Sequence, residues 1–200
     1  SGTISDLASN NAVYMNFRSY ASATGGQAVY AHQETTTIGG SSYYFQRLIS
    51  ADAAGTQLSA DGGTIGRKLM GKFVYQLTGV SSVPASTWTI YYRAIKDHNQ
   101  IAAHCDVDIL VRMSNGTVRS TIATHVANSG PIAGSYSTVS GTYSWTLYPV
   151  VDETDYLEFD YYIDVTAIKS GNSAYLMIDN NALATADQTR AANVFLPNEY

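Results

Sequence analysis

The stretch Asp155-Tyr-Leu-Glu-Phe-Asp-Tyr-Tyr-Ile-Asp-Val-Thr-Ala-Ile168 decides the fold of this chain. From Leu157 to Val165 apolar and polar side chains alternate without a break. A period of two is that of a β-strand, whereas a helix would scatter these apolar residues around its axis. The pattern therefore predicts a strand with one buried and one solvated face. The buried face holds Leu157, Phe159, Tyr161, Ile163 and Val165, and the solvated face holds Glu158, Asp160, Tyr162 and Asp164.

On both sides of this stretch, alternating apolar and polar runs separated by turn residues fill most of the chain. Gly39-Gly40 and Asn115-Gly116 each stand between two extended runs, which is the pattern of a β-hairpin. Residues 174–178 are expected to pair antiparallel with the strand at 157–165, and residues 50–65 to form a long loop. We expect an all-β fold of about ten strands: a two-sheet antiparallel β-sandwich with the topology of a jelly roll.

The domain organisation follows from the same patterns. Residues 1–11 are small and polar, and we expect a flexible N-terminal leader that orders against a partner. A strand is expected at 12–20, and residues 12–200 form a single sandwich domain, since 200 residues suit one domain of this class. The first residue is Ser1, which we interpret as a processed terminus of a secreted, extracellular or cell-surface protein.

Composition excludes several functional classes. The net charge is -5 and the largest basic cluster is Arg67-Lys68, so nucleic acid is not an expected partner. No apolar run approaches the roughly 20 residues of a membrane-spanning helix. The single cysteine, Cys105, lies in an alternating run and is predicted to be a small buried hydrophobe. No nucleophile elbow, phosphate loop or cofactor motif is present, and we expect neither catalysis nor a bound organic cofactor.

Histidines and carboxylates offer two kinds of metal site. His104 and His125 flank the Asn115-Gly116 turn at similar distances, so they could approach each other with Asp106 as a third ligand. The alternative is a pair of ordinary surface histidines. Calcium takes roughly six to eight oxygen ligands, often from loops. The predicted calcium ligands are Asp152, Glu153, Asp155 and Asp179, and the alternative is a solvated acidic surface.

Charged side chains also recur on the strands themselves. Asp106 and Asp108 share one strand face, and three carboxylates share the solvated face of the strand at 157–165. If the two faces adjoin, these like charges require a cation or an arginine. Arg93 and Arg112 are the available partners.

Adjacent tyrosine pairs place one ring inside the sheet and one outside. An outer ring could stack on a sugar, or pack against a neighbouring subunit. The pairs are Tyr43-Tyr44, Tyr91-Tyr92 and Tyr161-Tyr162. Asn115-Gly-Thr117 is also a glycosylation sequon, although the turn accounts for the asparagine without a glycan.

Four stretches of this chain resemble an uncharacterised group of secreted β-rich proteins of environmental bacteria and archaea. The stretches are His32-Gln-Glu-Thr-Thr-Thr-Ile-Gly-Gly40, Gly66-Arg-Lys-Leu-Met-Gly-Lys-Phe-Val74, His104-Cys-Asp-Val-Asp-Ile-Leu110, and Ala186-Asp-Gln-Thr-Arg-Ala-Ala-Asn193 through Leu196-Pro-Asn-Glu-Tyr200. In composition and fold class the chain is also similar to jelly-roll subunits of extracellular tubes and fibres, such as canulae and donor-strand pili. These resemblances imply no catalytic residue.

The leading hypothesis is a structural subunit that polymerises with copies of itself by strand addition, because open sheet edges invite pairing with another chain. Residues 1–20 are the candidate donor strand, and the segment at 194–200 is the second choice. The donor's interface residues are Ile4, Leu7, Val13, Met15 and Phe17. The alternative is a monomeric carbohydrate-binding module or adhesin, which binds a glycan in a groove lined by Tyr and Trp.

Overall fold

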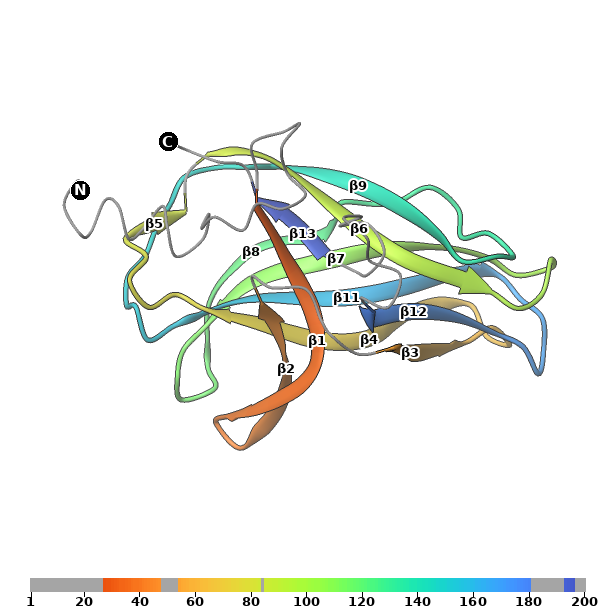
Figure 1. Ribbon diagram of the computed structural model, residues 1–200, viewed down its shortest axis with the longest axis horizontal. Helices are drawn as coiled ribbons and strands as arrows, with labels where there is room; N and C mark the ends of the chain where they lie inside the picture. Colours follow the sequence, from red (N-terminus) through yellow and green to blue (C-terminus); the bar gives the residue numbers. More distant parts are fainter. Residues whose placement is uncertain (1–26, 48–53, 84, 181–192, 197–200) are drawn as a thin grey trace.

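The computed structural model describes residues 27–47, 54–83, 85–180 and 193–196, which form thirteen strands and no helix (Figure 1). The strands are β1 (Gln27–Ile38), β2 (Ser41–Arg47), β3 (Ala54–Asp61), β4 (Gly66–Gln76), β5 (Ser82–Val83), β6 (Ser86–Lys96), β7 (Ala102–Arg112), β8 (Val118–Val126), β9 (Ser137–Trp145), β10 (Tyr148–Pro149), β11 (Tyr156–Ala167), β12 (Ser173–Asn180) and β13 (Asn193–Leu196). The predicted all-β sandwich is therefore confirmed.

Eleven of the strands form one continuous sheet that folds over into two layers, and ten of them follow one another along a single path. Its order is β3-β12-β6-β13-β1-β2-β4-β11-β7-β8, with β9 on the other edge of β6. β10 and β5 form a separate two-stranded sheet. The path turns from one layer to the other at β1 and β2, and Figure 1 shows β1 crossing steeply relative to the long strands. All pairings are antiparallel except that of β2 with β4.

The two layers enclose a core built from the alternating faces of their central strands. Trp88 and Tyr92 point inward from β6, and their rings lie 6.1 Å from those of Phe159 and Tyr161 of β11, respectively. All four side chains are buried, as is Cys105, which was predicted to be a buried hydrophobe. Burial of the Cys105 thiol raises its pKa above the ordinary value, so no reactive thiolate is expected there.

The strand that decides the fold, β11, lies at the centre of the second layer between β4 and β7. Phe159 is opposite both Phe73 and Ile109. The expected pairing of β11 with residues 174–178 is wrong, because β12 pairs with β3 and β6 in the first layer. The chain crosses between layers after β11, so the apolar faces of β11 and β12 meet across the core. A period of two identifies a strand but does not identify its neighbour.

Two local expectations differ from the structure. The predicted loop at 50–65 contains β3, because Leu58 and Ala60 pack toward the core in a polar-looking sequence. The hairpin turn predicted at Asn115 and Gly116 is a three-residue loop rather than the two-residue turn that Asn-Gly usually forms. There only Gly116 has positive φ, at 93°, and its N–H donates to the carbonyl of Met113 over 2.9 Å. This is the bulged type of hairpin turn.

The face of β11 predicted to be solvated is largely covered. Glu158 is 0% exposed and Asp160 is 4% exposed. The end of the β1–β2 hairpin lies over this face, and Ile38, Tyr43 and Val74 form a second small apolar cluster there. The hairpin turn at Gly39 touches the β7–β8 turn at Asn115 and Gly116, and the two turns lie side by side in Figure 1.

The expected leader at 1–11 and the expected strand at 12–20 lie outside the described residues. Within the part of the chain that the structure describes, no helix is long and apolar enough to cross a membrane.

Candidate functional site

A groove opens where β2 separates from β4. The two strands run parallel and pair at only two positions, Tyr44 with Phe73 and Phe45 with Val74. On the N-terminal side of these pairs lies a cavity of about 510 Å³. Its lining residues come from the β1–β2 hairpin and from β4: Thr35, Ser41, Ser42, Tyr43, Tyr44, Leu69, Gly71 and Lys72.

The edge of β4 beside the groove has few ladder partners among the described residues. One edge of β4 pairs with β11 from Gly66 to Gln76. On the opposite edge the described residues provide partners only for Phe73 and Val74. Backbone N–H and C=O groups are obligatory hydrogen-bonding groups, so an unpaired strand edge is a template for a further strand.

The groove's side wall is shaped by Gly71. The Tyr44 ring stacks on the Phe73 ring with centroids 4.8 Å apart and planes 18° apart. A Cβ at Gly71 would lie 2.9 Å from the Phe73 ring and 3.0 Å from the Tyr44 ring. Glycine therefore allows the Tyr44 ring to lie directly against the β4 backbone at the groove.

The outer face of the second layer carries buried and half-buried ion pairs. The Arg112 guanidinium donates to both carboxylate oxygens of Glu158, with the Nη2–Oε2 distance at 3.1 Å. This confirms Arg112 as a partner for the carboxylates of β11. Arg93, the other expected partner, lies over the Tyr136 ring at 5.7 Å instead.

Arg67 is the partner of Asp106 and Asp108, which the sequence pattern did not indicate. Its Nε donates to Asp106 Oδ1 over 2.7 Å, and its Nη2 donates to Asp108 Oδ1 over 2.7 Å. The same guanidinium lies 3.5 Å from the centroid of the Tyr162 ring. Arg67 is far from these residues in sequence, and β4 reaches them only across β11, so no sequence spacing could have indicated the pairing.

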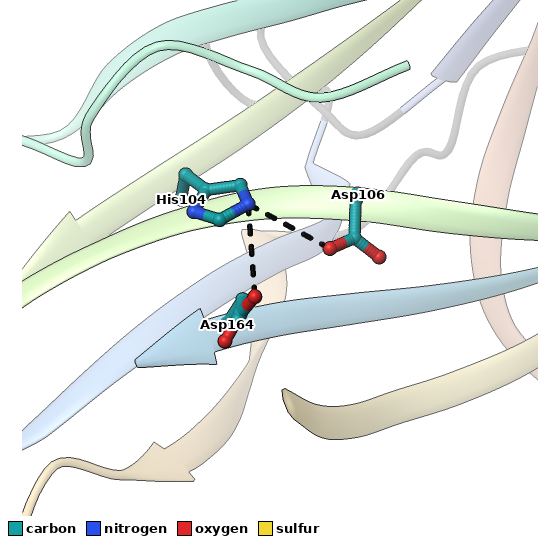
Figure 2. Close-up of side chains that lie close together, drawn as sticks. All are labelled: His104, Asp106 and Asp164. Atoms are coloured by element: carbon teal, nitrogen blue, oxygen red, sulfur yellow. Dashed lines mark ion pairs between the residues drawn. The ribbon is translucent and has the colours of Figure 1, made fainter. Parts of the chain in front are cut away.

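Next to Arg67, the imidazole of His104 faces the carboxylates of Asp106 and Asp164 (Figure 2). His104 Nε2 lies 3.8 Å from Asp106 Oδ2 and 3.8 Å from Asp164 Oδ2. His104 and Asp106 share one face of β7, and Asp164 is the cross-strand neighbour of His104 on β11. These ligand atoms all lie within 4.8 Å of one another, and the described residues contain no other such group of three.

His125 does not lie opposite His104, so the two histidines do not form the shared site that was weighed as one alternative. The register shifts between β7 and β8, and Val126 lies opposite Val107. His104 instead forms a β-bridge with Pro131 of the following loop. Asp106, the third ligand considered, does lie in the observed group, whereas the position expected for His125 is taken by Asp164.

Asp160 is a buried carboxyl group with an unusual environment. Burial, together with the hydrogen bond and negative charge of Glu158, raises the pKa of Asp160 to about 9. One of its oxygens, Oδ1, has no hydrogen-bond partner among the described residues. Burial and the neighbouring Glu158 carboxylate therefore favour the protonated form of Asp160.

The predicted calcium ligands have other contacts where the structure describes them. Asp155 is buried, and both of its carboxylate oxygens accept hydrogen bonds from Arg119. Asp152 Oδ1 accepts from the backbone N–H and the hydroxyl of Thr154 over 2.9 Å. Asp179 lies in β12 rather than in a loop. The calcium site stays a prediction.

Aromatic side chains contribute mostly to packing. Tyr92 and Tyr161 are buried while their neighbours Tyr91 and Tyr162 are half-buried, as the alternation predicted. Among the side chains whose exposure the structure describes, no aromatic residue is fully exposed. The predicted donor residues Ile4, Leu7, Val13, Met15 and Phe17 lie outside the described residues.

No protein-family model matches the sequence, and no curated protein matches it. Among solved structures, the chain is similar to the CBM22-1 xylan-binding domain of Paenibacillus barcinonensis Xyn10C, with 12% identity, a TM-score of 0.36, and coverage of 86% of this chain and 94% of that domain. A CBM4 structure matches with 12% identity and a TM-score of 0.29, over 76% of this chain and 89% of that chain. An infectious bursal disease virus structure (Gt strain) matches with 8% identity and a TM-score of 0.33, over 75% of this chain and 37% of the viral chain. At these values the likenesses assign neither ligand nor partner to this chain.

Proposed function

We propose that this chain is the structural subunit of an extracellular filament or tube, in which a terminal segment of one copy adds as a strand to the next copy. The observation that carries the proposal is the edge of β4 beside the β2–β4 groove, where the described residues provide ladder partners only for Phe73 and Val74. An added strand would satisfy the backbone groups of β4, and its side chains would enter the groove.

The donor in this proposal is residues 1–20 of a second copy. Val13, Met15 and Phe17 alternate with Tyr14, Asn16 and Arg18, as a strand with one apolar face requires. The groove offers apolar surface at Leu69 and Tyr44, beside the small residues Gly71, Ser41 and Ser42. Ile4 and Leu7 extend the same donor toward its N-terminal end.

A contact of this kind joins two different surfaces, the donor of one copy and the groove of the next. Such head-to-tail contacts propagate as open fibres unless the rotation between copies closes a ring. The charged fraction of 14% suits a protein whose surface is extensively covered by copies of itself.

A second candidate function is glycan binding in the same groove. It is favoured by the hydroxyl groups of Thr35, Ser41 and Ser42 and the ammonium group of Lys72 along the lining. The cavity volume of about 510 Å³ lies in the range of small-molecule sites. Glycan-array binding by a protein that sediments as a monomer would favour this candidate over the filament subunit.

The proposed function is tested by changing the groove without changing the core. Leu69 is 44% exposed on β4 at the groove, and Leu147 is 58% exposed between β9 and β10. Leu69→Lys places a charge where the donor's apolar side chains enter, so we expect loss of polymer. Leu147→Lys is the matched control and should polymerise like the unchanged protein.

Sedimentation velocity and negative-stain microscopy report the assembly state of both variants, and far-UV circular dichroism reports their fold. Folded Leu69→Lys protein that polymerises as well as the Leu147→Lys control would show that the groove is not the acceptor.

A further inference from the structure

The group of His104, Asp106 and Asp164 is built from three neighbouring positions on the outer face of the second layer. Asp164 is directly opposite His104, and Asp106 is two residues along β7 on the same face. β7 and β11 are central strands paired along their whole length, so their backbones hold the three residues in fixed relation. The site therefore lies on rigid elements rather than on loops, which favours defined coordination.

The three side chains approach one another without forming hydrogen bonds between His104 and the two carboxylates. His104 Nε2 lies 3.8 Å from one oxygen of each carboxylate, beyond hydrogen-bonding distance. Asp106 is only 1% exposed, whereas His104 and Asp164 are each 29% exposed. A small ion can therefore reach the group from solvent while one of its ligands is held inside the protein (Figure 2).

Negative charge exceeds positive charge around this group. Asp106, Asp108 and Asp164 gather on neighbouring strands, and Arg67 pairs with the first two. Asp106 uses Oδ1 for Arg67, while the oxygen directed at His104 is Oδ2. A divalent cation bound by Asp106 Oδ2 and the Asp164 carboxylate would neutralise the excess negative charge.

The ligand types select the class of metal. Calcium and magnesium prefer oxygen ligands alone, whereas an imidazole with two carboxylates suits zinc, manganese or cobalt. Ligand atoms around a tetrahedral zinc at about 2.0–2.2 Å lie roughly 3.3–3.6 Å from one another. The two imidazole–carboxylate separations of 3.8 Å exceed that range by a few tenths of an ångström, and all three ligand atoms lie within 4.8 Å of one another, so side-chain rotation has to draw the ligands closer to reach that geometry.

We propose that His104 Nε2, Asp106 Oδ2 and Asp164 Oδ2 bind a divalent transition-metal ion, with water completing its coordination. The bound metal ion links β7 to β11 through their side chains on the outer face of the second layer. The site is independent of the β2–β4 groove, since none of its three residues lines that groove.

The experiment titrates ZnCl₂ into the purified full-length protein by calorimetry, after treatment with a chelator and buffer exchange. His104→Gln and Asp164→Asn each remove one ligand from a partly exposed position while keeping its size. His125→Asn is the control, because it removes an exposed histidine on β8, and Asn tolerates the φ of 54° at that position. Thermal melting without metal checks that all variants fold.

The proposal expects one zinc ion per chain and a melting temperature that rises with zinc, since only the folded protein holds the site. Each ligand variant should weaken binding by about tenfold or more. His125→Asn should bind as the unchanged protein does. An unchanged affinity in both ligand variants, or no saturable zinc binding by the unchanged protein, would overturn the assignment.

Discussion

The ring of Tyr44 in β2 stacks on the ring of Phe73 in β4, with centroids 4.8 Å apart. This contact coincides with one of the two residue pairs that join the strands, and the groove opens beside it. The stack thus holds β2 against β4 at one end while the edge of β4 toward Gly66 is left without a described partner. The geometry of the proposed acceptor depends on this contact.

Gly71 should be the least replaceable residue of the groove. Gly71→Ala places a Cβ within 3.0 Å of both the Tyr44 and Phe73 rings, so the stack must shift. We expect a loss of about 1–3 kcal/mol in the free energy of unfolding, as for other overpacked sites. Urea denaturation measures it. Gly134→Ala is the control, since its Cβ meets no atom within 4 Å. Equal stability of the two variants would contradict the described packing.

Among the described residues, Arg112 is the charged side chain that donates hydrogen bonds to Glu158 of β11. Both side chains are buried, at 0% and 7% exposed. Arg112→Met leaves the carboxylate without that partner and should destabilise the fold by about 3–5 kcal/mol. The double variant Arg112→Met with Glu158→Gln should recover part of the loss. Guanidinium denaturation of the single and double variants measures the coupling. Additive losses would mean that the pair does not interact as described.

Asp160 should make stability depend on pH. Its pKa rises from 3.8 to about 9 on folding, so the folded protein retains a proton that the unfolded chain releases near pH 4. The stabilisation from this proton is complete below about pH 4 and is lost as the pH rises toward 9. The Asp160→Asn side chain does not titrate in this pH range, so it stays neutral throughout.

The Asp160→Asn variant should therefore match the unchanged protein near pH 4 and exceed its stability at pH 8, by an amount that grows by up to about 1.4 kcal/mol per pH unit over this range. Thermal melting at both pH values tests this. A difference between the two proteins that stays constant from pH 4 to pH 8 would show that Asp160 is ionised in the folded state.

The sequence predicted the positions of the strands better than it predicted which strands pair with each other. The alternation at 157–165 located β11 and its buried face, and the Gly39-Gly40 and Asn115-Gly116 turns located two hairpins. The partner of β12 was missed because strands of opposite layers carry the same pattern. β3 was missed because glycines and aspartates near its ends resemble a loop. The burial of Glu158 was not predicted because the β1–β2 hairpin that lies over it is distant in sequence.

The candidate site was only partly visible in the sequence. His104 and Asp106 were considered as ligands, but together with His125, because the two histidines flank the Asn115-Gly116 turn. Asp164 joins them through the antiparallel register of β7 and β11, which no local spacing encodes. The groove depends on where β2 leaves β4, and this parallel contact between non-consecutive strands has no turn residue to mark it.

The proposal that copies join through residues 1–20 is tested most directly by microscopy of the protein with and without that segment. The full-length protein should form fibres in negative stain, and the variant lacking residues 1–20 should remain folded and monomeric. Adding a synthetic peptide of residues 1–20 should yield a one-to-one complex with the shortened protein but no fibre. Fibres formed by the shortened protein, or a full-length protein that stays monomeric at high concentration, would contradict the account.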